Sequence, residues 1–510
     1  MVHIPNVNEI QTATAPQIDV LTLTTVVGDK IDLTPLFLSL DIYEDIFSHI
    51  LTGKIIINDT LDLFSKIPIC GQEKLTFKIY SKDYKPTSKI NYLHRTFDII
   101  RITDVIQVND YTKSYTLHFA SPEFKMSESF KLSKAFYDTT YSNVIATIMT
   151  EDFTLDRETR GFSFPTQNYT NRDEILSPYI NENIEAWYNK QDDDDSIELF
   201  IEKTKYSEPV ISFPFMKPFN IFSWLAARSL RESGGRYGTK NSGQAANFFF
   251  FENKRGFQFV SLDTLLESRD KSNVTTRFKY GSGNQNKETI REGNRIIYRE
   301  VIDKIQIQNC YNIIANLRNG MYASRLYSYD LSTGETTHID YNYIDNFHNT
   351  ESTERKQNTG DYPPIPHDDE DLSRRYLAHQ SFIVHSPTRG IDCIISEQTG
   401  RHSEYKENST GSEEYIQKRL SQIARLNNFR VLFSIDGNSK HKVGDCVELD
   451  LKTWNDMPTS SQAIKDFNEA SSKYYSGNYL ITSIRHKITK YTYNMDIEVV
   501  KDAYKTKIGD

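Results

Sequence analysis

Val443-Gly444-Asp445-Cys446-Val447-Glu448-Leu449-Asp450-Leu451 decides the fold, because apolar and polar residues alternate in it after a glycine. Alternation with a period of two is typical of a β-strand with one buried face. A stretch of the same form lies near the other end of the chain, where Gly71 precedes Lys74-Leu75-Thr76-Phe77-Lys78-Ile79-Tyr80.

Each stretch is followed by two more strand-like segments in the same order. These are Phe97–Ile102 and Tyr115–Phe119 near the N-terminus, and Tyr479–Ile484 and Tyr493–Val499 near the C-terminus. One β unit present twice predicts a duplicated barrel. In a symmetric ring such a duplication doubles the apparent symmetry, which favours a role in assembly over a role in catalysis.

Composition sets limits on the class of protein. The chain has 510 residues, which allows about 3 or 4 domains. Aromatic residues make up 12% of it, an enrichment that fits strands and large interfaces. The formal net charge of -9 argues against a protein that coats DNA through a basic surface, and no sequence-specific contact with nucleic acid is expected.

The first residues carry no targeting signal. Met1–Ile10 has neither a basic stretch nor an apolar stretch of the kind found in secretory signals. No run in the chain reaches the ~18 apolar residues that a membrane span requires. We therefore expect no transmembrane segment, and assembly in a cytoplasm.

The expected fold class is α+β and mainly β, with two similar antiparallel β-barrel domains, a mixed α/β middle region and polar insertions. The predicted divisions are an N-terminal arm at 1–18, a first barrel at 19–120, a mixed region at 121–217, a region of helix, hairpin and strands at 218–375, and a second barrel at 376–510. An acidic, proline-rich insert at 350–374 is expected to be an exposed loop or a disordered insert, and a polar insert at 453–475 interrupts the second β unit.

The middle of the chain predicts helices and a hairpin. The predicted elements are a helix at Ser142–Met149 with Ser142 as its N-cap, a helix at Pro218–Arg231 ended by Ser233-Gly234-Gly235, a hairpin of Asn247–Phe251 and Phe257–Ser261, a short helix at Leu262–Glu267, and a helix at Gly411–Phe429. Residues 268–300 are highly charged, and no element is predicted in them.

No cofactor and no metal site is predicted. The four cysteines, Cys70, Cys310, Cys393 and Cys446, are scattered and are expected to be buried as small apolar side chains. The run Asp192–Asp195 lacks the spacing of a calcium loop, so a solvated acidic loop is the better interpretation. His94, His118 and His486 share no spacing that would bring them to one metal, and ordinary barrel or surface positions are expected for them.

Glu232 is the sharpest catalytic candidate. Arg231-Glu232-Ser233-Gly234-Gly235, at the end of the predicted helix, resembles the catalytic segment of lytic transglycosylases. That resemblance implies a peptidoglycan-cleaving tail enzyme with Glu232 as general acid/base, which requires the carboxyl to lie in an apolar cleft. The Gly-Leu-Met-Gln continuation of that family is absent, and a surface glutamate before a glycine cap explains the same residues.

Three parts of the chain, in order, resemble the central hub protein of contractile phage tail baseplates. The first part is Ile31–Leu33, Leu40–Phe47, Leu51–Asp59 and Gly71–Leu75. The second is Phe222–Arg228 with the hairpin of Asn247–Phe251 and Gly256–Ser261, and the third is Gly477–His486. The resemblance implies a structural virion protein without enzymatic activity, located in the virion tail baseplate and assembled in the host cytoplasm.

In that family each subunit carries two tail-tube-like barrels, so three subunits form a pseudo-sixfold ring. The resemblance implies a homotrimer that adapts the sixfold tail tube to the threefold central spike around the DNA exit channel. Its implied partners are the central spike protein, tail tube or tube-initiator proteins, the tape measure protein and the neighbouring wedge proteins of the baseplate. The acidic balance is compatible with a channel that must not hold DNA. A host-binding tail protein is a third interpretation, because tyrosine-rich surfaces also suit carbohydrate and protein contacts.

Overall fold

The computed structural model describes most of the chain. The described residues are 15–67, 69–81, 92–152, 162–163, 184–189, 197–205, 207–232, 246–271, 274–280, 289–292, 295–329, 336–347, 350–354, 381–385, 412–451, 472 and 474–504. Strands dominate and helices are fewer, so the prediction of a mainly β fold with helices is confirmed.

Seven strands near the N-terminus form one row. They are β1 (Pro16–Thr24), β2 (Lys30–Asp32), β3 (Phe37–Asp45), β4 (Thr52–Asp59), β5 (Lys74–Ser81), β6 (Leu93–Asn109) and β7 (Thr112–Ala120), with the short helix α1 (Leu63–Lys66) after β4. Their order in the sheet is β2-β1-β5-β6-β7-β4-β3. We call these strands the N-terminal strand group. Gly28, with φ +97°, lies in the turn between β1 and β2.

A second set of strands combines the C-terminal part of the chain with its middle. It contains β15 (Val274–Tyr280), β16 (Thr289–Glu292), β17 (Arg295–Cys310), β21 (Phe429–Asp436), β22 (Cys446–Asp450), β23 (Gly477–Thr489) and β24 (Tyr493–Lys501). We call it the C-terminal strand group. Six of its strands pair in the circuit β22-β15-β17-β21-β24-β23, and β23 pairs with β22 again.

The C-terminal strand group differs from the predicted second unit in two ways. β15 runs parallel to both β17 and β22, so the prediction of a wholly antiparallel unit is wrong at this strand. β15 was missed because its one fully buried apolar side chain in the described part, Phe278, stands among charged and small polar residues. The second difference is that β15, β16 and β17, which precede residue 376, lie in the same sheet as β21 to β24, which follow it. The predicted domain boundary at residue 376 stays a prediction.

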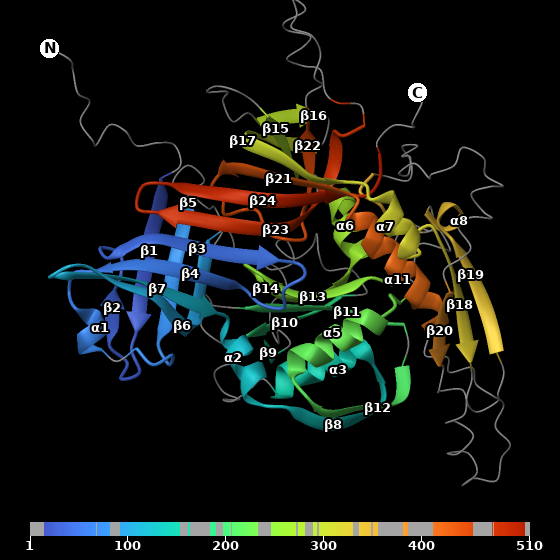
Figure 1. Cartoon of the computed structure of the whole chain (residues 1–510), viewed down its shortest axis with the longest axis horizontal. Coiled ribbons are helices and arrows are strands. Elements are labelled where there is room, and N and C mark those ends of the chain that lie inside the picture. The colour runs from blue at the N-terminus through green and yellow to red at the C-terminus, as the bar shows by residue number, and fades with distance from the viewer. Residues whose placement is uncertain are drawn as a thin grey trace, which may run out of the picture.

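The repeated order of strands is confirmed. In the N-terminal group β5, β6, β7, β4 and β3 are successive neighbours, and in the C-terminal group β22, β23, β24, β21 and β17 are successive neighbours. The two groups are joined by pairing between β3 and β23, so one continuous sheet contains both. Figure 1 shows the red strands β23 and β24 lying beside the blue strands β3 and β4.

The middle of the chain packs below this sheet (Figure 1). Its elements are α2 (Pro122–Ser129), β8 (Leu132–Thr140), α3 (Tyr141–Thr147), a π-helical turn at Ile148–Asp152, β9 (Phe162–Ser163), β10 (Ile184–Asn189), β11 (Glu198–Glu202), β12 (Ser207–Met216), α5 (Pro218–Arg228), β13 (Phe248–Asn253), β14 (Gly256–Ser261) and α6 (Leu262–Lys271). The remaining elements lie at the right of Figure 1. They are α7 (Ile313–Arg318), β18 (Ala323–Tyr329), β19 (Thr336–Asn342), α8 (Tyr343–Phe347), β20 (Ser381–His385) and α11 (Ser412–Leu426).

Two helix ends differ from the prediction. Thr140, not Ser142, caps α3, because its side chain accepts a hydrogen bond from the Asn143 amide while Ser142 lies inside the helix. α5 ends at Arg228, before the glycines, because Ser229 is already extended at φ -73° and ψ 140°. The predicted stop at Ser233-Gly234-Gly235 lies outside the described residues. The β13–β14 hairpin and the helices α6 and α11 are confirmed.

A single apolar core extends through both strand groups. It contains Leu40 and Phe119 from the N-terminal group, Ile484 and Ile497 from the C-terminal group, and Phe251 from the hairpin. A second core of mostly aromatic and branched side chains lies between α3, α5 and the faces of β11, β13 and β14. The continuous first core means that the two strand groups stabilise each other by burial of apolar surface.

Candidate assembly site

The two strand groups meet along β3 and β23. Seven residue pairs join the two strands in antiparallel register, from Asp45 opposite Ser483 to Ser39 opposite Thr489. The Ile46 amide continues the contact by donating to the Thr482 carbonyl at 3.0 Å. We call this pairing the internal junction. This pairing joins the two repeated units into one continuous sheet.

Charged side chains on the outer side of the internal junction hold its register. Arg485 donates from Nη2 to Asp41 Oδ2 at 3.0 Å, and Lys54 Nζ lies 3.8 Å from the same oxygen. Asp41 is nearly buried, with 5% of its side chain exposed, whereas Arg485 is more than one third exposed. The Tyr43 hydroxyl also lies 3.4 Å from Asp41, and burial followed by this carboxylate raises the pKa of Tyr43.

A buried polar cluster lies on the inner side of the internal junction. His486 Nε2 is 3.4 Å from Glu44 Oε1, and His486 Nδ1 is 2.9 Å from the Tyr493 hydroxyl. The other carboxylate oxygen of Glu44 accepts from the Val443 amide at 3.3 Å. Burial, with the Glu44 charge, raises the pKa of Tyr493 well above its ordinary value. His486 therefore connects the two strand groups. The prediction for His486 was an ordinary barrel or surface position and did not include this connection.

The tip of the β13–β14 hairpin touches both strand groups. Glu252 accepts hydrogen bonds from the Leu51 amide at 2.9 Å and from the Ser121 hydroxyl, and Arg95 donates to the Asn253 carbonyl at 3.1 Å. On the other side Lys254 Nζ donates to the Ser439 carbonyl in the C-terminal strand group. The hairpin therefore connects the two strand groups in addition to the internal junction.

The ionisable groups at this tip are desolvated. Burial raises the pKa of Glu252 to about 7, against the opposing effect of the Arg95 guanidinium. Burial lowers the pKa of Lys254 to about 7. Such values reflect the cost of holding a charge away from water. They make the tip sensitive to pH near neutrality.

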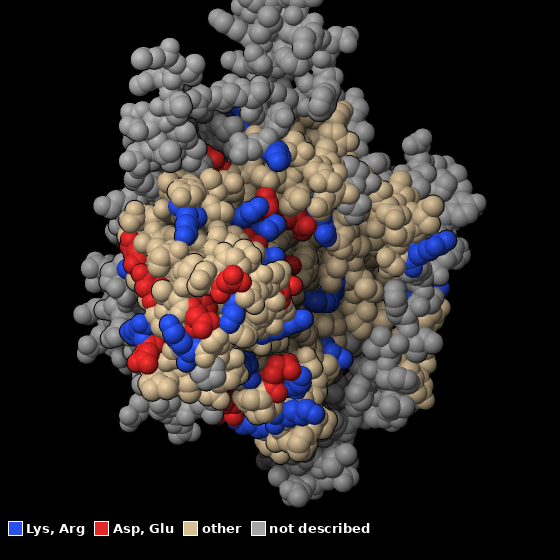
Figure 2. Space-filling view, turned by 60° about the vertical axis from the view of Figure 1, so that its left-hand side comes forward, with Lys and Arg blue, Asp and Glu red and all other residues tan. Residues whose placement is uncertain are grey.

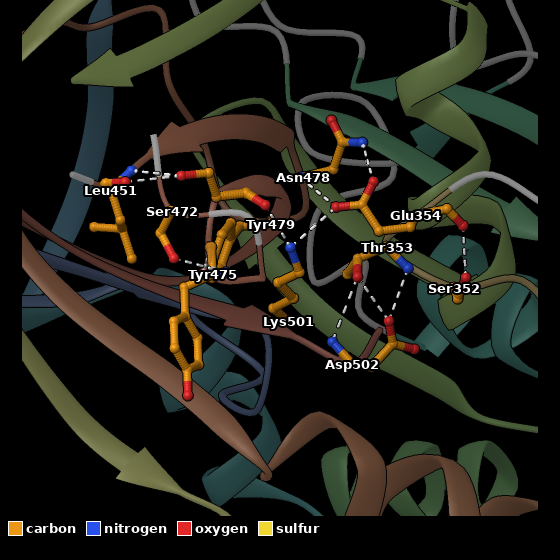
Figure 3. Close-up of polar contacts among 11 residues, drawn as sticks. Ser352, Thr353, Glu354, Leu451, Ser472, Tyr475, Asn478, Tyr479, Lys501 and Asp502 are labelled. Atoms are coloured by element: carbon orange, nitrogen blue, oxygen red, sulfur yellow. Dashed lines mark hydrogen bonds and ion pairs between the residues drawn. The ribbon is translucent and has the colours of Figure 1, made fainter. Parts of the chain in front are cut away.

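The C-terminal strand group is fastened to the segment 350–354 by a second polar network (Figure 3). Lys501 Nζ lies 3.1 Å from Glu354 Oε1, and the same oxygen accepts from the Asn478 amide at 2.9 Å. Asp502 accepts from the Thr353 amide and hydroxyl, both at 2.8 Å. Because Thr353 and Glu354 are buried, the prediction of an exposed insert is wrong for its first residues, and 355–374 lies outside the described residues.

Glu232 does not occupy a catalytic environment. Its side chain is exposed, so it lacks the apolar cleft that the general-acid role requires. The buried member of that segment is Arg231, which lies 2.9 Å from Glu202 and donates to Glu267 at 2.5 Å. The segment therefore anchors β11 to α6 through an ion pair, and the enzymatic alternative loses its structural basis.

The other predicted positions give no metal site in the described part of the chain. No group of three or more His, Cys, Asp or Glu side chains there is arranged to hold a metal. Asp192–Asp195 and Cys393 lie outside the described residues. Cys70 is exposed, so its predicted burial is wrong, and its backbone amide donates a hydrogen bond to the Glu73 carboxylate. Cys446 is half-buried. Within the same described residues, no helix has the length and apolarity to cross a membrane.

Both strand groups mix charges on the surface that Figure 2 brings forward. Lysine and arginine side chains stand among aspartate and glutamate side chains there, without a large patch of one sign. A continuous basic stripe, as needed for binding along a nucleic-acid backbone, is not seen on this face.

No family model and no curated protein matches the sequence. Solved structures align with most of the chain at low sequence identity. The chain is similar in structure to phage tail proteins. The 43 kDa tail protein of prophage MuSo2 from Shewanella oneidensis matches 95% of this chain and 98% of its own length, with 8% identity and a TM-score of 0.44. A tail protein from Neisseria meningitidis MC58 matches 95% and 96%, with 8% identity and a TM-score of 0.43.

A third match is the c3393 protein of Escherichia coli, described as a type VI secretion component similar to the T4 tail proteins gp27 and gp5. It covers 97% of this chain and 78% of its own length, with 7% identity and a TM-score of 0.37.

The contact between Glu44 and His486 was not predicted from the sequence, although the sequence contains a signal for it. Glu44 stands in the apolar phase of β3, between Ile42 and Ile46, and His486 stands in the apolar phase of β23, between Ile484 and Ile488. A charged or polar residue on the buried face of each of two strands indicates that the two side chains satisfy each other.

Proposed function

We propose that this protein is the central hub of a phage tail baseplate, a structural virion protein without enzymatic activity. Each strand group forms one tube-like barrel, and three chains form a ring with six barrels. The ring adapts a sixfold tail tube to a threefold spike and surrounds the channel through which DNA leaves. Its partners are the spike, the tube or tube initiator, the tape measure protein and the wedge proteins, and the site of action is the virion tail.

The observation that carries the proposal is the repeated strand order together with the internal junction. The neighbours β5-β6-β7-β4-β3 and β22-β23-β24-β21-β17 follow the same order, and β3 pairs with β23. Two equivalent units fixed side by side supply one third of a six-unit ring. The sequence resemblance to hub proteins supports the same conclusion.

The proposal is tested by the position of the chain in intact particles. Electron cryomicroscopy of the tail should find three copies around the axis, between the tube and the spike. Each copy should present its two strand groups to the channel at nearly equal radius. A copy number of six or twelve, or a location at the tail fibres, would refute the hub assignment and favour a host-binding protein.

A further inference from the structure

One edge of β23 is shared between two partners. Its first part pairs with β22, ending at Cys446 opposite Leu480, and Ile481 adds a bond from its amide to the Asp445 carbonyl at 2.9 Å. The register against β24 then shifts between Ile481 and Ser483. Beyond this bulge the same edge of β23 pairs with β3, forming the internal junction.

β6 repeats the first half of this arrangement. Its first part pairs with β5, ending at Lys74 opposite Asp98, and the Ile99 amide donates to the Glu73 carbonyl at 3.0 Å. The register against β7 shifts between Ile99 and Arg101, at the place that corresponds to the bulge of β23. Beyond this bulge, none of the described strands pairs with that edge of β6.

β3 and β17 correspond in the same way. β3 has a bulge between Phe37 and Ser39 against β4, and β17 has a bulge between Ile302 and Lys304 against β21. β3 gives its second edge to β23. The second edge of β17 pairs with β15 only as far as Ile302, and no described strand covers it afterwards.

The uncovered parts of β6 and β17 expose apolar side chains. Ile106 is 60% exposed and Ile307 is 50% exposed. On the paired strand β3, Ile42 holds the position that corresponds to Ile307, and it is buried. An edge that is long, apolar and unpaired is a template for another strand. Figure 1 shows the β6–β7 arm reaching beyond the rest of the molecule on its left side.

We propose that the uncovered edge of β6 in one copy pairs with the uncovered edge of β17 in a second copy, in antiparallel register. This contact rests on the proposed ring and repeats the internal junction between chains. Each chain carries one edge of each kind, so the contact is head-to-tail and closes when the rotation permits. Internal and intermolecular junctions then alternate around the ring.

The internal junction also sets the register of the contact. Arg485 lies opposite Tyr43 and Lys487 lies opposite Asp41. Aligning the bulges and the pairs with β4, β7, β21 and β24 places Thr103 at the position of Arg485 and Ile106 at the position of Lys487. The same alignment places Asn309 at the position of Tyr43 and Gln306 at that of Asp41. Thr103 of one copy therefore faces Asn309 of the other, and Ile106 faces Gln306.

Cysteine cross-linking tests this register. Two full-length single variants, Ile106→Cys and Gln306→Cys, are made in a Cys70→Ser background, mixed, and treated with a mild oxidant or a short bis-thiol reagent. A covalent dimer should form in the mixture and not in either variant alone, because opposite positions of paired strands bring their Cβ atoms close. The double variant should give a ladder that ends at the covalent trimer.

A matched control uses Tyr111→Cys in place of Ile106→Cys. Tyr111 is 87% exposed at the tip of the same arm, beyond the proposed pairing, and should give no specific product with Gln306→Cys. Ile307→Lys should abolish the oligomer in light scattering while circular dichroism stays unchanged, because its counterpart Ile42 is buried in the internal junction; Tyr111→Lys should leave the oligomer intact.

The outcomes separate this contact from the hub assignment. A trimer without the 106–306 product, or equal products from positions 106 and 111, overturns the contact and leaves the hub assignment standing. The 106–306 product in a protein absent from the tail axis supports the contact and refutes the hub assignment. A chain that remains monomeric at high concentration overturns the contact.

Discussion

Replacing Glu252 by glutamine should remove the part of the pH dependence of stability between pH 5 and pH 8 that comes from this carboxyl group. Glu252 is 1% exposed and connects the β13–β14 hairpin to the Leu51 amide and the Ser121 hydroxyl. Glutamine has almost the same shape and keeps an acceptor for the Leu51 amide, but it cannot ionise. The variant therefore isolates the effect of the buried charge from the effect of packing.

The sign follows from the direction of the pKa shift. Burial raises the pKa of Glu252 from 4.5 to about 7, so between these values the native chain holds a proton that the unfolded chain has released. The contribution of Glu252 to stability is present in full below the unfolded pKa and is lost as pH rises through the native pKa. A raised pKa of this size corresponds to a loss of about 2–3 kcal/mol between pH 5 and pH 8.

Thermal unfolding at pH 5 and pH 8 measures this loss. An unfolding entropy of about 2.1 cal/mol/K per residue converts this loss into a change of Tm of about 2–3 °C for a cooperative chain of this length. The Tm of Glu252→Gln should rise relative to that of the parent by this amount from pH 5 to pH 8. Glu128→Gln, at an exposed carboxylate, serves as the control. A difference in Tm that is the same at both pH values would refute the assignment of the pH dependence to Glu252.

Three further changes test other parts of the structure by thermal unfolding. Arg231→Met should cost about 3–5 kcal/mol, because two buried carboxylates lose their counterion; Glu232→Gln, at the exposed neighbour, should cost nearly nothing, and equal effects would contradict the buried ion pair. Gly53→Ala should cost about 1–3 kcal/mol, because the added Cβ would lie 2.3 Å from the Phe119 ring, and an unchanged Tm would count against this close approach. Phe250→Ala should cost about 3–5 kcal/mol through the cavity left between α5 and β14, with a loss under 1 kcal/mol speaking against the packing described.

The strands with clear alternation were predictable, and those with mixed sequence were not. β5 and β22 follow a period of two with every second side chain buried, so local pattern and burial agree. β15 is different, because its surroundings, rather than its own sequence, hold it between β17 and β22. The short helix α3 was found, but its cap was placed two residues late because Thr140 and Ser142 can both act as caps.

The candidate site was harder to predict than the fold. The internal junction joins residues 39–45 to residues 483–489. The local sequence of neither strand indicates which strand it pairs with. Only the misplaced polarity of Glu44 and His486 on apolar faces indicates that each needs a distant partner. The buried role of Arg231 was hidden for a related reason, since both of its carboxylate partners are remote in sequence.

The distance along the chain between the partners of the internal junction has a consequence for biosynthesis. Glu44 and His486 are separated by 442 positions, so the ribosome completes nearly the whole protein before β23 exists. At a synthesis rate of about 5–20 residues per second, the edge of β3 waits roughly 20–90 s for its partner. During that interval a nascent chain offers an apolar strand edge to its neighbours on the same messenger. We therefore expect the protein to need a chaperone that holds this edge when it is made at high level.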